Sequence, residues 1–192
     1  MLAWTAALAL ATSLAGCGNE RGRPAGLARP GKPAELINYS SASGDVSFGH
    51  PSTWTVVEGR LPEVARLASG SAVATIYAYP RTDLPEGPVG AENSRRRLLE
   101  SLHRRAPSFQ VESSRTTEID DAPAVEILGR GRIAGEAVKT RSVHVYKGAA
   151  EYVIDAYARP AAFGRADRNA FRPLLATVRL GGRAEASEAT NG

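Results

Sequence analysis

The fold is decided by residues 137–158, AVKTRSVHVYKGAAEYVIDAYA. This stretch predicts two β-strands, Ala137–Tyr146 and Glu151–Ala158, joined by a turn at residues 147–150. Alternation with a period of two is typical of pleated strands. After its first residue, Glu151, the second strand is apolar on both faces except at Asp155, and strands covered on both faces have this pattern. We therefore place the second strand in the middle of an antiparallel sheet.

The first strand of this pair carries both apolar and charged side chains. We expect Val143 and Val145 to share one face with Ala137. We expect the other face to carry Tyr146 and three polar side chains, which are Lys139, Arg141 and His144. The strand would then have one buried face and one wetter face.

The remaining elements follow from the same periodicities. Strands are expected at residues 44–48, 54–57, 72–79, 109–117 and 123–130, and helices at Val89–Arg105 and Ala161–Val178, the second interrupted at Pro173. Residues 59–70 are ambiguous, because Leu61, Val64 and Leu67 could share one face of a short helix. Hairpin-joined strands with two well-separated helices predict an α+β fold, an α/β/α sandwich around a central antiparallel sheet. We expect Trp54 to pack in its core with Phe48 or Phe171.

Composition limits the functional classes. The chain has 192 residues, of which 43% are hydrophobic and 23% charged, which are ordinary globular values. Residues 36–180 have the length of one domain with a single core. The net charge of +4 is spread thinly along the chain. Because nucleic-acid binders concentrate basic residues in a stripe, we expect no nucleic-acid partner.

The N-terminus predicts export and lipidation. Residues 1–16 carry no charged side chain, are rich in Ala and Leu, and are too short to span a bilayer comfortably. They fit the apolar region of a signal peptide, although no Lys or Arg precedes them. Residues 14–17, Leu-Ala-Gly-Cys, resemble a bacterial lipobox, in which the cysteine is acylated and becomes the new N-terminus. Cys17 is the only cysteine of the chain. The alternative is an ordinary signal peptide cut after residues 9–11, Ala-Leu-Ala.

The segments on either side of the domain are expected to be disordered. Residues 18–35, next to the lipidated Cys17, contain Pro24, Pro30 and Pro33 and few large apolar side chains. Such a segment cannot bury enough surface to offset its ordering entropy, so residues 17–35 would form a tether. Residues 181–192 are small and polar and are expected to form a tail. The expected location is the bacterial cell membrane, lipid-anchored and facing outside the cytoplasm.

The sequence contains no clear catalytic or metal-binding motif. The three histidines, His50, His103 and His144, are distant in sequence from one another and from Cys17, so no zinc-ligand spacing is present. No Gly-x-Ser-x-Gly elbow occurs. The pair Asp120–Asp121 fits a turn or, alternatively, part of a divalent-cation site. We expect no catalytic residue, metal or cofactor. A pocket that gathered His144, Asp155 and a serine would instead favour an enzyme.

The densest charge lies on the helix predicted at residues 89–105. It contains the run Arg95–Arg97 and the pair Arg104–Arg105. Helical periodicity brings some of these side chains to one side, so we regard the following as candidate partner-binding residues: Arg96, Arg97 and Arg104. Their partner would be an acidic envelope protein or an anionic envelope polymer. The alternative is that they form a solvated outer face.

The order of elements resembles a known superfamily. Phe48 followed by His50-Pro51-x-x-Trp54 is similar to the F-x-x-P-x-x-W opening of the PsbP-like superfamily, which includes PsbP, Mog-type Ran-binding proteins and LpqN-type lipoproteins. The similarity continues through Thr116-Thr117, Pro123-Ala124, Phe163 and Phe171, and departs at Asp120-Asp121, where glycine is common. The resemblance implies an α/β/α sandwich and a binding role without catalysis.

Together these features predict a membrane-anchored, extracytoplasmic lipoprotein that acts as a binding or accessory module and not as an enzyme. Its partners would be the membrane, through the lipid anchor, and an envelope protein or anionic polymer. Two alternatives stay open: an envelope hydrolase with an unrecognised site, and a purely structural envelope lipoprotein.

Replacement of Cys17 by Ser tests the anchor. Cys17→Ser keeps size and polarity but removes the thiol nucleophile that lipidation requires. We expect the variant to move from the membrane to the soluble fraction, or to stay unprocessed, when both forms are expressed in a bacterial host and fractionated. Membrane retention with normal processing in the variant would contradict lipidation at Cys17.

Overall fold

A computed structural model describes residues 35–181 of the chain. The predicted signal peptide, the predicted lipidation site Cys17, the predicted tether up to residue 34 and the predicted tail from residue 182 lie outside the described residues. Among residues 35–181, no helix has both the length and the apolar character needed to cross a bilayer.

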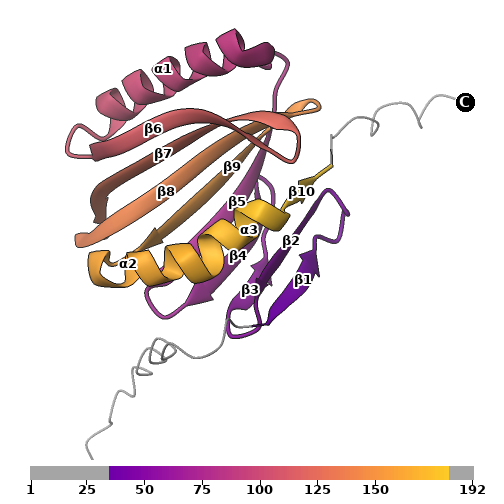
Figure 1. Cartoon of the computed structure of the whole chain (residues 1–192), viewed down its shortest axis with the longest axis vertical. Coiled ribbons are helices and arrows are strands. Elements are labelled where there is room, and N and C mark those ends of the chain that lie inside the picture. The colour runs from indigo at the N-terminus through magenta and orange to yellow at the C-terminus, as the bar shows by residue number, and fades with distance from the viewer. Residues whose placement is uncertain (1–34, 182–192) are drawn as a thin grey trace, which may run out of the picture.

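A seven-stranded antiparallel sheet forms the middle of the molecule (Figure 1). Its strands lie in the order β3 (Thr55–Glu58), β4 (Glu63–Ser69), β5 (Ala72–Pro80), β9 (Ala150–Ala158), β8 (Glu136–Lys147), β7 (Ala122–Ile133) and β6 (Gln110–Ile119). The predicted central position of the second strand of the 137–158 hairpin is confirmed, because β9 pairs with β5 on one side and β8 on the other.

A smaller sheet joins the two ends of the described chain. It consists of β1 (Leu36–Ser40), β2 (Val46–Pro51) and β10 (Arg179–Leu180), with β2 in the middle. The sequence pattern predicts β2 approximately, but it predicts neither of its partners. β10 pairs through only two residues, and β1 is mostly exposed, so neither has a periodic burial pattern that a sequence could reveal.

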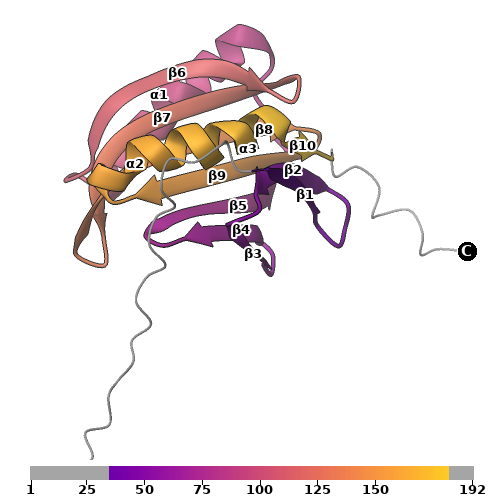
Figure 2. The same cartoon turned by 60° about the horizontal axis from the view of Figure 1, so that its bottom comes forward.

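The helices cover opposite faces of the large sheet (Figures 1 and 2). α1 (Gly87–Arg105) packs on β6 and β7. On the other face lies a continuous helical segment formed by α2 (Pro160–Ala166), a π-helical turn (Asp167–Phe171) and α3 (Arg172–Thr177). The predicted α+β fold with helical layers on both sides of an antiparallel sheet is confirmed. The α-helical pattern is interrupted by the π-helical turn, and Pro173 stands in the first turn of α3.

The structure resolves the ambiguity at residues 59–70. They do not form a helix, since β4 pairs with β3 and β5, burying Leu67 and leaving Leu61 59% exposed. The face expected for Arg141 and Lys139 is wrong. Both lie on the α2 side of β8 with Val143, because residues two apart on a strand share a face. The prediction is wrong because it assigned charged side chains to the wetter face, whereas the fold buries the charge of Arg141 on the apolar face.

The core lies mainly between the sheet and the α2–α3 segment. Small alanines of β5 and β9 allow the aromatic side chains of the helical segment to approach the sheet closely. Trp54 meets Phe171 edge to face, with ring centroids 5.7 Å apart, as the sequence predicts for one of its two candidate partners. A second, smaller cluster under α1 consists of Val125, Ile127 and Tyr146 with leucines of the helix.

Arg141 holds the sheet and the helical segment together. Its Nε and Nη2 donate to the two carboxylate oxygens of Asp167 at 2.7 and 3.0 Å, and its Nη1 donates to Glu126. The side chains of these three residues are at most 7% exposed. The carboxylates are also paired with Arg115 and Arg172, which are 68% and 65% exposed. Every buried charge in this cluster therefore has a partner of opposite sign.

Replacement of Arg141 by Met tests the importance of this cluster. The change keeps an unbranched side chain but leaves Glu126 and Asp167 buried with only exposed arginines beside them, so we expect unfolding in urea to require about 3 kcal/mol less free energy. The matched control Arg172→Met changes an exposed member of the cluster and should cost under about 0.5 kcal/mol. Equal losses in the two variants would contradict the central role of Arg141.

Candidate functional site

A hollow with both polar and apolar lining lies beside α1, on the part of the sheet that this helix leaves uncovered. α1 packs on β6 and β7, so the adjoining face of β8, β9 and β5 borders an open groove with a volume of about 540 Å³. We call this hollow the α1 groove. Its size lies within the range of small-ligand sites. The groove lies at this position because α1 is narrower than the sheet on which it packs.

One wall of the α1 groove is apolar. Leu98 and Leu102 recur at helical spacing and pack against the small cluster around Ile127. Phe109, just after the helix, and Val138 and Ile133 from the far ends of the strands continue this wall. Glycines at positions 129 and 131 make room for the Phe109 ring, since a Cβ at either would lie within 3 Å of it. The wall therefore depends on residues distant in sequence.

The floor of the α1 groove is polar because three neighbouring strands present hydrogen-bonding side chains at the same level. Pairing between β5, β9 and β8 places Thr75, Asp155 and Ser142 directly beside one another across the sheet. The remaining polar side chains of the floor surround this row: Tyr77, Thr140, His144 and Tyr157. The floor combines hydroxyl groups, one imidazole and one carboxylate.

A hydrogen-bonded network connects part of the floor. The Ser142 hydroxyl donates to Asp155 Oδ1 at 2.6 Å, and His144 Nδ1 lies 2.8 Å from Glu151 Oε1. The His144 hydrogen bond is the main reason why the pKa of Glu151 lies below its ordinary value, with burial opposing the effect and the charge of Arg81 reinforcing it. Glu151 is therefore ionised at neutral pH and accepts, so His144 Nδ1 carries the proton.

The same groups approach the arrangement of a Ser-His-acid triad. Ser142 Oγ lies 3.4 Å from His144 Nε2, on the opposite side of the ring from Glu151. The groove thus gathers His144, Asp155 and a serine, which is the arrangement that would favour an enzyme. The sequence analysis did not identify Ser142 or Glu151. A signal for this pair is nevertheless present in the sequence: counting residues outward from the turn at 147–150 along the two strands places Ser142 opposite Asp155.

Two features of the geometry argue against nucleophilic catalysis by Ser142. Its single hydroxyl proton is donated to Asp155 at 2.6 Å, whereas His144, the base that would have to remove it, is 3.4 Å away. Ser142 also lies in the middle of β8, an interior strand that pairs on both sides, so the neighbouring backbone N–H groups belong to the sheet. Oxyanion holes need such donors pointing at the reacting carbonyl.

The other histidines lie outside the α1 groove. His50 is buried, with Nδ1 3.1 Å from the carbonyl oxygen of Pro51, and His103 is exposed near the end of α1. Among the described residues, no three His, Cys, Asp or Glu side chains gather as a metal site would require. The three histidines are therefore not brought together by the fold.

The candidate partner-binding arginines are exposed on α1. Arg96, Arg97 and Arg104 all face solvent, and Arg96 donates to Asn93 on the same helix. Arg95 is different, because it pairs with Glu92 and donates to Ser114 of β6, which fixes the helix on the sheet. The first three arginines thus form an accessible surface outside the groove, and their role in binding stays a prediction.

Asp120 and Asp121 form the tight turn between β6 and β7. Both have positive φ, 51° and 58°, which Asp tolerates better than most residues. Asp120 accepts from Lys147 Nζ at 2.5 Å and from the Leu180 backbone N–H at 2.7 Å. Burial would raise the pKa of Asp120, but these two hydrogen bonds together hold it below its ordinary value. The pair therefore ties the turn to β8 and to the small sheet.

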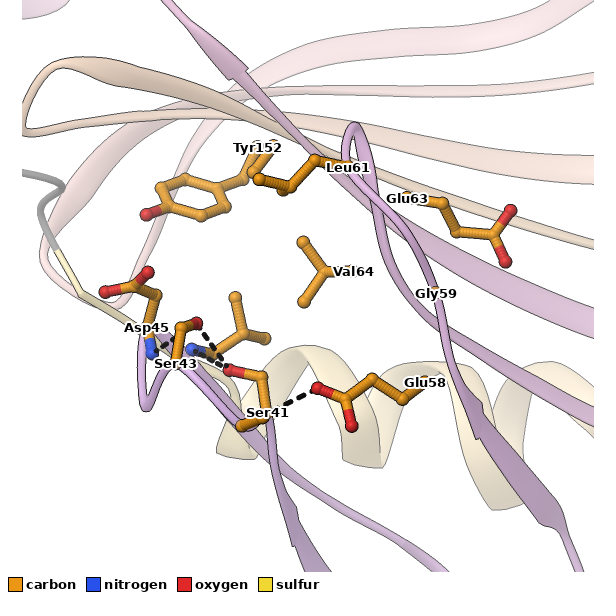
Figure 3. Close-up of a pocket in the computed structure, with 12 residues that line it drawn as sticks. Ser41, Ser43, Asp45, Glu58, Gly59, Leu61, Glu63, Val64 and Tyr152 are labelled. Carbon is orange, nitrogen blue, oxygen red and sulfur yellow. Dashed lines mark hydrogen bonds between the residues drawn. The ribbon is translucent and has the colours of Figure 1, made fainter.

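A smaller pocket of about 230 Å³ lies between the two sheets (Figure 3). The side chains around it include Asp45, Glu58 and Tyr152, and the Tyr152 hydroxyl donates to the carbonyl of Gly181. Glu58 accepts from the backbone N–H of Ala42 at 2.9 Å. These hydrogen bonds link the 41–45 turn and the end of β10 to their neighbours, so Glu58 and Tyr152 have a structural role in this pocket.

Comparison with known proteins identifies the fold. No protein-family model matches the chain, and no curated protein matches it in sequence. Solved structures do match. The solution structure of cyanobacterial PsbP (CyanoP) from Synechocystis sp. PCC 6803 has a TM-score of 0.56 at 9% identity, covering 82% of this chain and 99% of that one.

Two further structures have the same fold. The Ran-binding protein Mog1p of Saccharomyces cerevisiae has a TM-score of 0.52 at 6% identity, covering 77% of this chain and 96% of that one. LpqN of Mycobacterium tuberculosis, described as involved in cell envelope biogenesis, has a TM-score of 0.51 at 14% identity, covering 77% and 92%. The chain therefore has the PsbP-like fold, as its sequence pattern predicts. Identities this low support the fold alone.

Replacement of Glu151 by Gln tests the network in the groove. Because the folded-state pKa of Glu151 is lowered, its ionised form stabilises the fold above the ordinary Glu pKa of 4.5, and this contribution is lost as the pH falls through the folded-state pKa. We expect Glu151→Gln to lower the free energy of unfolding by about 1 kcal/mol at pH 7. The difference from wild type should disappear at strongly acidic pH in urea titrations.

The control for this experiment is Glu100→Gln, which changes an exposed carboxylate of α1. It should leave the stability within about 0.5 kcal/mol of wild type at every pH. A loss in Glu151→Gln that did not change with pH would mean that the charge of Glu151 contributes nothing to the network.

Proposed function

We propose that this protein is a membrane-anchored, extracytoplasmic lipoprotein that acts as a binding or accessory module without catalytic activity. The α1 groove is its ligand-binding surface. The observation that carries the proposal is the composition of this groove: an apolar wall from α1 beside a floor of hydroxyl, imidazole and carboxylate groups. Binding sites for small ligands combine apolar surface with a few directed polar groups in this way.

The location part of the proposal rests on the sequence before the domain. An uncharged apolar segment ends in a lipobox-like motif at Cys17, and a Pro-containing segment follows it. The descriptions of two proteins with the same fold support the accessory role. Mog1p is described as a Ran-binding protein and LpqN as involved in cell envelope biogenesis, and both descriptions are compatible with an accessory role.

The alternative function is an envelope hydrolase, and one observation favours it: Ser142, His144 and Glu151 lie in the order of a triad at 3.4 and 2.8 Å. We prefer binding because the Ser142 proton is donated to Asp155 and no free backbone donors surround Ser142 on its strand. Under this alternative, Ser142→Ala would abolish turnover of a chromogenic ester. Under the binding proposal, any slow turnover is the same in wild type and variant.

A capture experiment tests the binding function and compares the two candidate surfaces. The tagged full chain is expressed in a bacterial host. It is then used to capture components of the host's cell envelope after solubilisation in detergent. Ser101 lines the groove, so Ser101→Trp should fill it and reduce capture at least about tenfold. Ser108→Trp is the matched control, because Ser108 is exposed and lies outside the groove lining.

The triple variant Arg96→Gln, Arg97→Gln and Arg104→Gln examines the second surface in the same experiment. Capture that depends on these arginines and weakens with salt would assign binding to the exposed face of α1, with an acidic envelope protein or anionic polymer as the partner. Capture that is identical in all variants would contradict specific binding and favour a purely structural lipoprotein. Circular dichroism checks that each variant is folded.

A further inference from the structure

The charge of Asp155 is the least compensated feature of the α1 groove. Its side chain is half-buried on the central strand, and its hydrogen bond in the structure comes from the Ser142 hydroxyl. Within residues 35–181, no Lys, Arg or His forms an ion pair with it. Other buried or half-buried carboxylates do have cationic partners: Glu126, Asp167, Asp120 and Glu151. A carboxylate removed from water without a cation is costly, so an external cation would be favourable here.

The neighbours of Asp155 suit a cation. Strand pairing puts Thr75 on one side of it and Ser142 on the other, with Tyr77 and Tyr157 nearby on the same face. The hydroxyl oxygens are able to accept hydrogen bonds, and tyrosine ring faces attract positive charge. Burial first, and then the charges of Glu63 and Asp155, raise the pKa of Tyr77, so its hydroxyl stays protonated at neutral pH.

We propose that the α1 groove binds an aliphatic ammonium group, with Asp155 as its counter-ion and the apolar wall from α1 in contact with its carbon chain. This inference rests on the proposed binding function of the groove and specifies its ligand class. Leu98, Leu102 and Phe109 provide the surface for the chain.

The geometry favours an ammonium group over other cations. Asp155 Oδ1 already accepts from Ser142, whereas no group of residues 35–181 donates to its Oδ2. A guanidinium group is bound best by two parallel hydrogen bonds to both oxygens, whereas an ammonium group is a compact charge with three donors. A metal ion would need several carboxylate or imidazole ligands together, and no group of three His, Cys, Asp or Glu side chains that could hold a metal ion occurs among the described residues.

The cationic side chains around the groove leave this site open. Arg66 lies near both tyrosines, but Glu63 pairs with it at 2.6 Å. Arg132, which lines the groove, is exposed and donates to the carbonyl of Gly135 at 2.6 Å, and Arg105 is exposed at the end of α1. His144 is held by Glu151. None of these groups forms an ion pair with Asp155 among the described residues.

Titration of the full chain with pentylamine, 1-pentanol and pentanoate tests the proposal, because the three probes share one chain and differ in the head group. We expect pentylamine to bind at least about tenfold more tightly than either other probe. Asp155→Asn keeps the shape and the acceptor for Ser142 but removes the charge, so it should abolish this preference. Asp121→Asn, at an exposed carboxylate of the β6–β7 turn, should leave the preference unchanged.

Two further probes distinguish the natural sources of the ammonium group. 1,5-Diaminopentane represents a free polyamine, and acetyl-Gly-Lys-Gly-amide represents a lysine side chain of a protein. Tighter binding of one identifies the source, and binding of either in an Asp155-dependent manner supports the proposal. Equal affinity for amine and alcohol, or unchanged amine binding in Asp155→Asn, would overturn it.

The result is separable from that of the capture experiment. Ser101→Trp should block the amines as well, since it fills the same groove. If this variant loses envelope capture while no amine binds the wild type, the binding function stands and the ligand class is wrong. If no amine binds and capture is the same in every variant, both proposals are wrong.

Discussion

Arg141 forms the buried contact on which the arrangement of the two layers depends. It reaches from the sheet to Asp167 with two parallel hydrogen bonds and to Glu126 with a third. A planar guanidinium group constrains both the distance and the direction of its carboxylate partner. Asp167 begins the π-helical turn between α2 and α3, so the ion pair fixes that turn above the middle of the sheet. A protein can become more stable when all members of a buried ion pair of this kind are replaced by apolar residues, so we infer that the contribution of the pair here is to orientation.

The position of the helical segment decides what the other face of the sheet can do. Because the α2–α3 side holds most of the core, α1 needs to cover only β6 and β7 on its own side. The uncovered face of β8, β9 and β5 then carries polar side chains that contact both the sheet and solvent. The α1 groove is the boundary between these two environments, which explains why one wall is apolar and the floor is polar.

The polar floor is also the place where the central strand departs from an apolar pattern. Asp155 interrupts β9, whose other residues after Glu151 are apolar or aromatic, and its partner Ser142 comes from the neighbouring strand. Departures from local consistency are common at functional sites, because a group required for binding replaces one that packs better. Tyr146, two residues after His144 on the same face of β8, is buried, and burial, followed by the charge of Glu151, raises its pKa to about 12.

The sequence by itself determined the hairpin at residues 137–158, the central position of its second strand, the helix of α1 and the PsbP-like order of elements, because these depend on local periodicity and on turns. It also predicts Cys17 as a lipidation site, from a motif that needs no fold. Only the tertiary structure decided that residues 63–69 form a strand, that Arg141 is buried, and that Ser142, His144, Glu151 and Asp155 meet beside α1. These features depend on contacts between residues that are distant in sequence: the pairing of strands, the buried ion pairs and the part of the sheet that α1 covers. Such contacts leave no periodic signal in the chain.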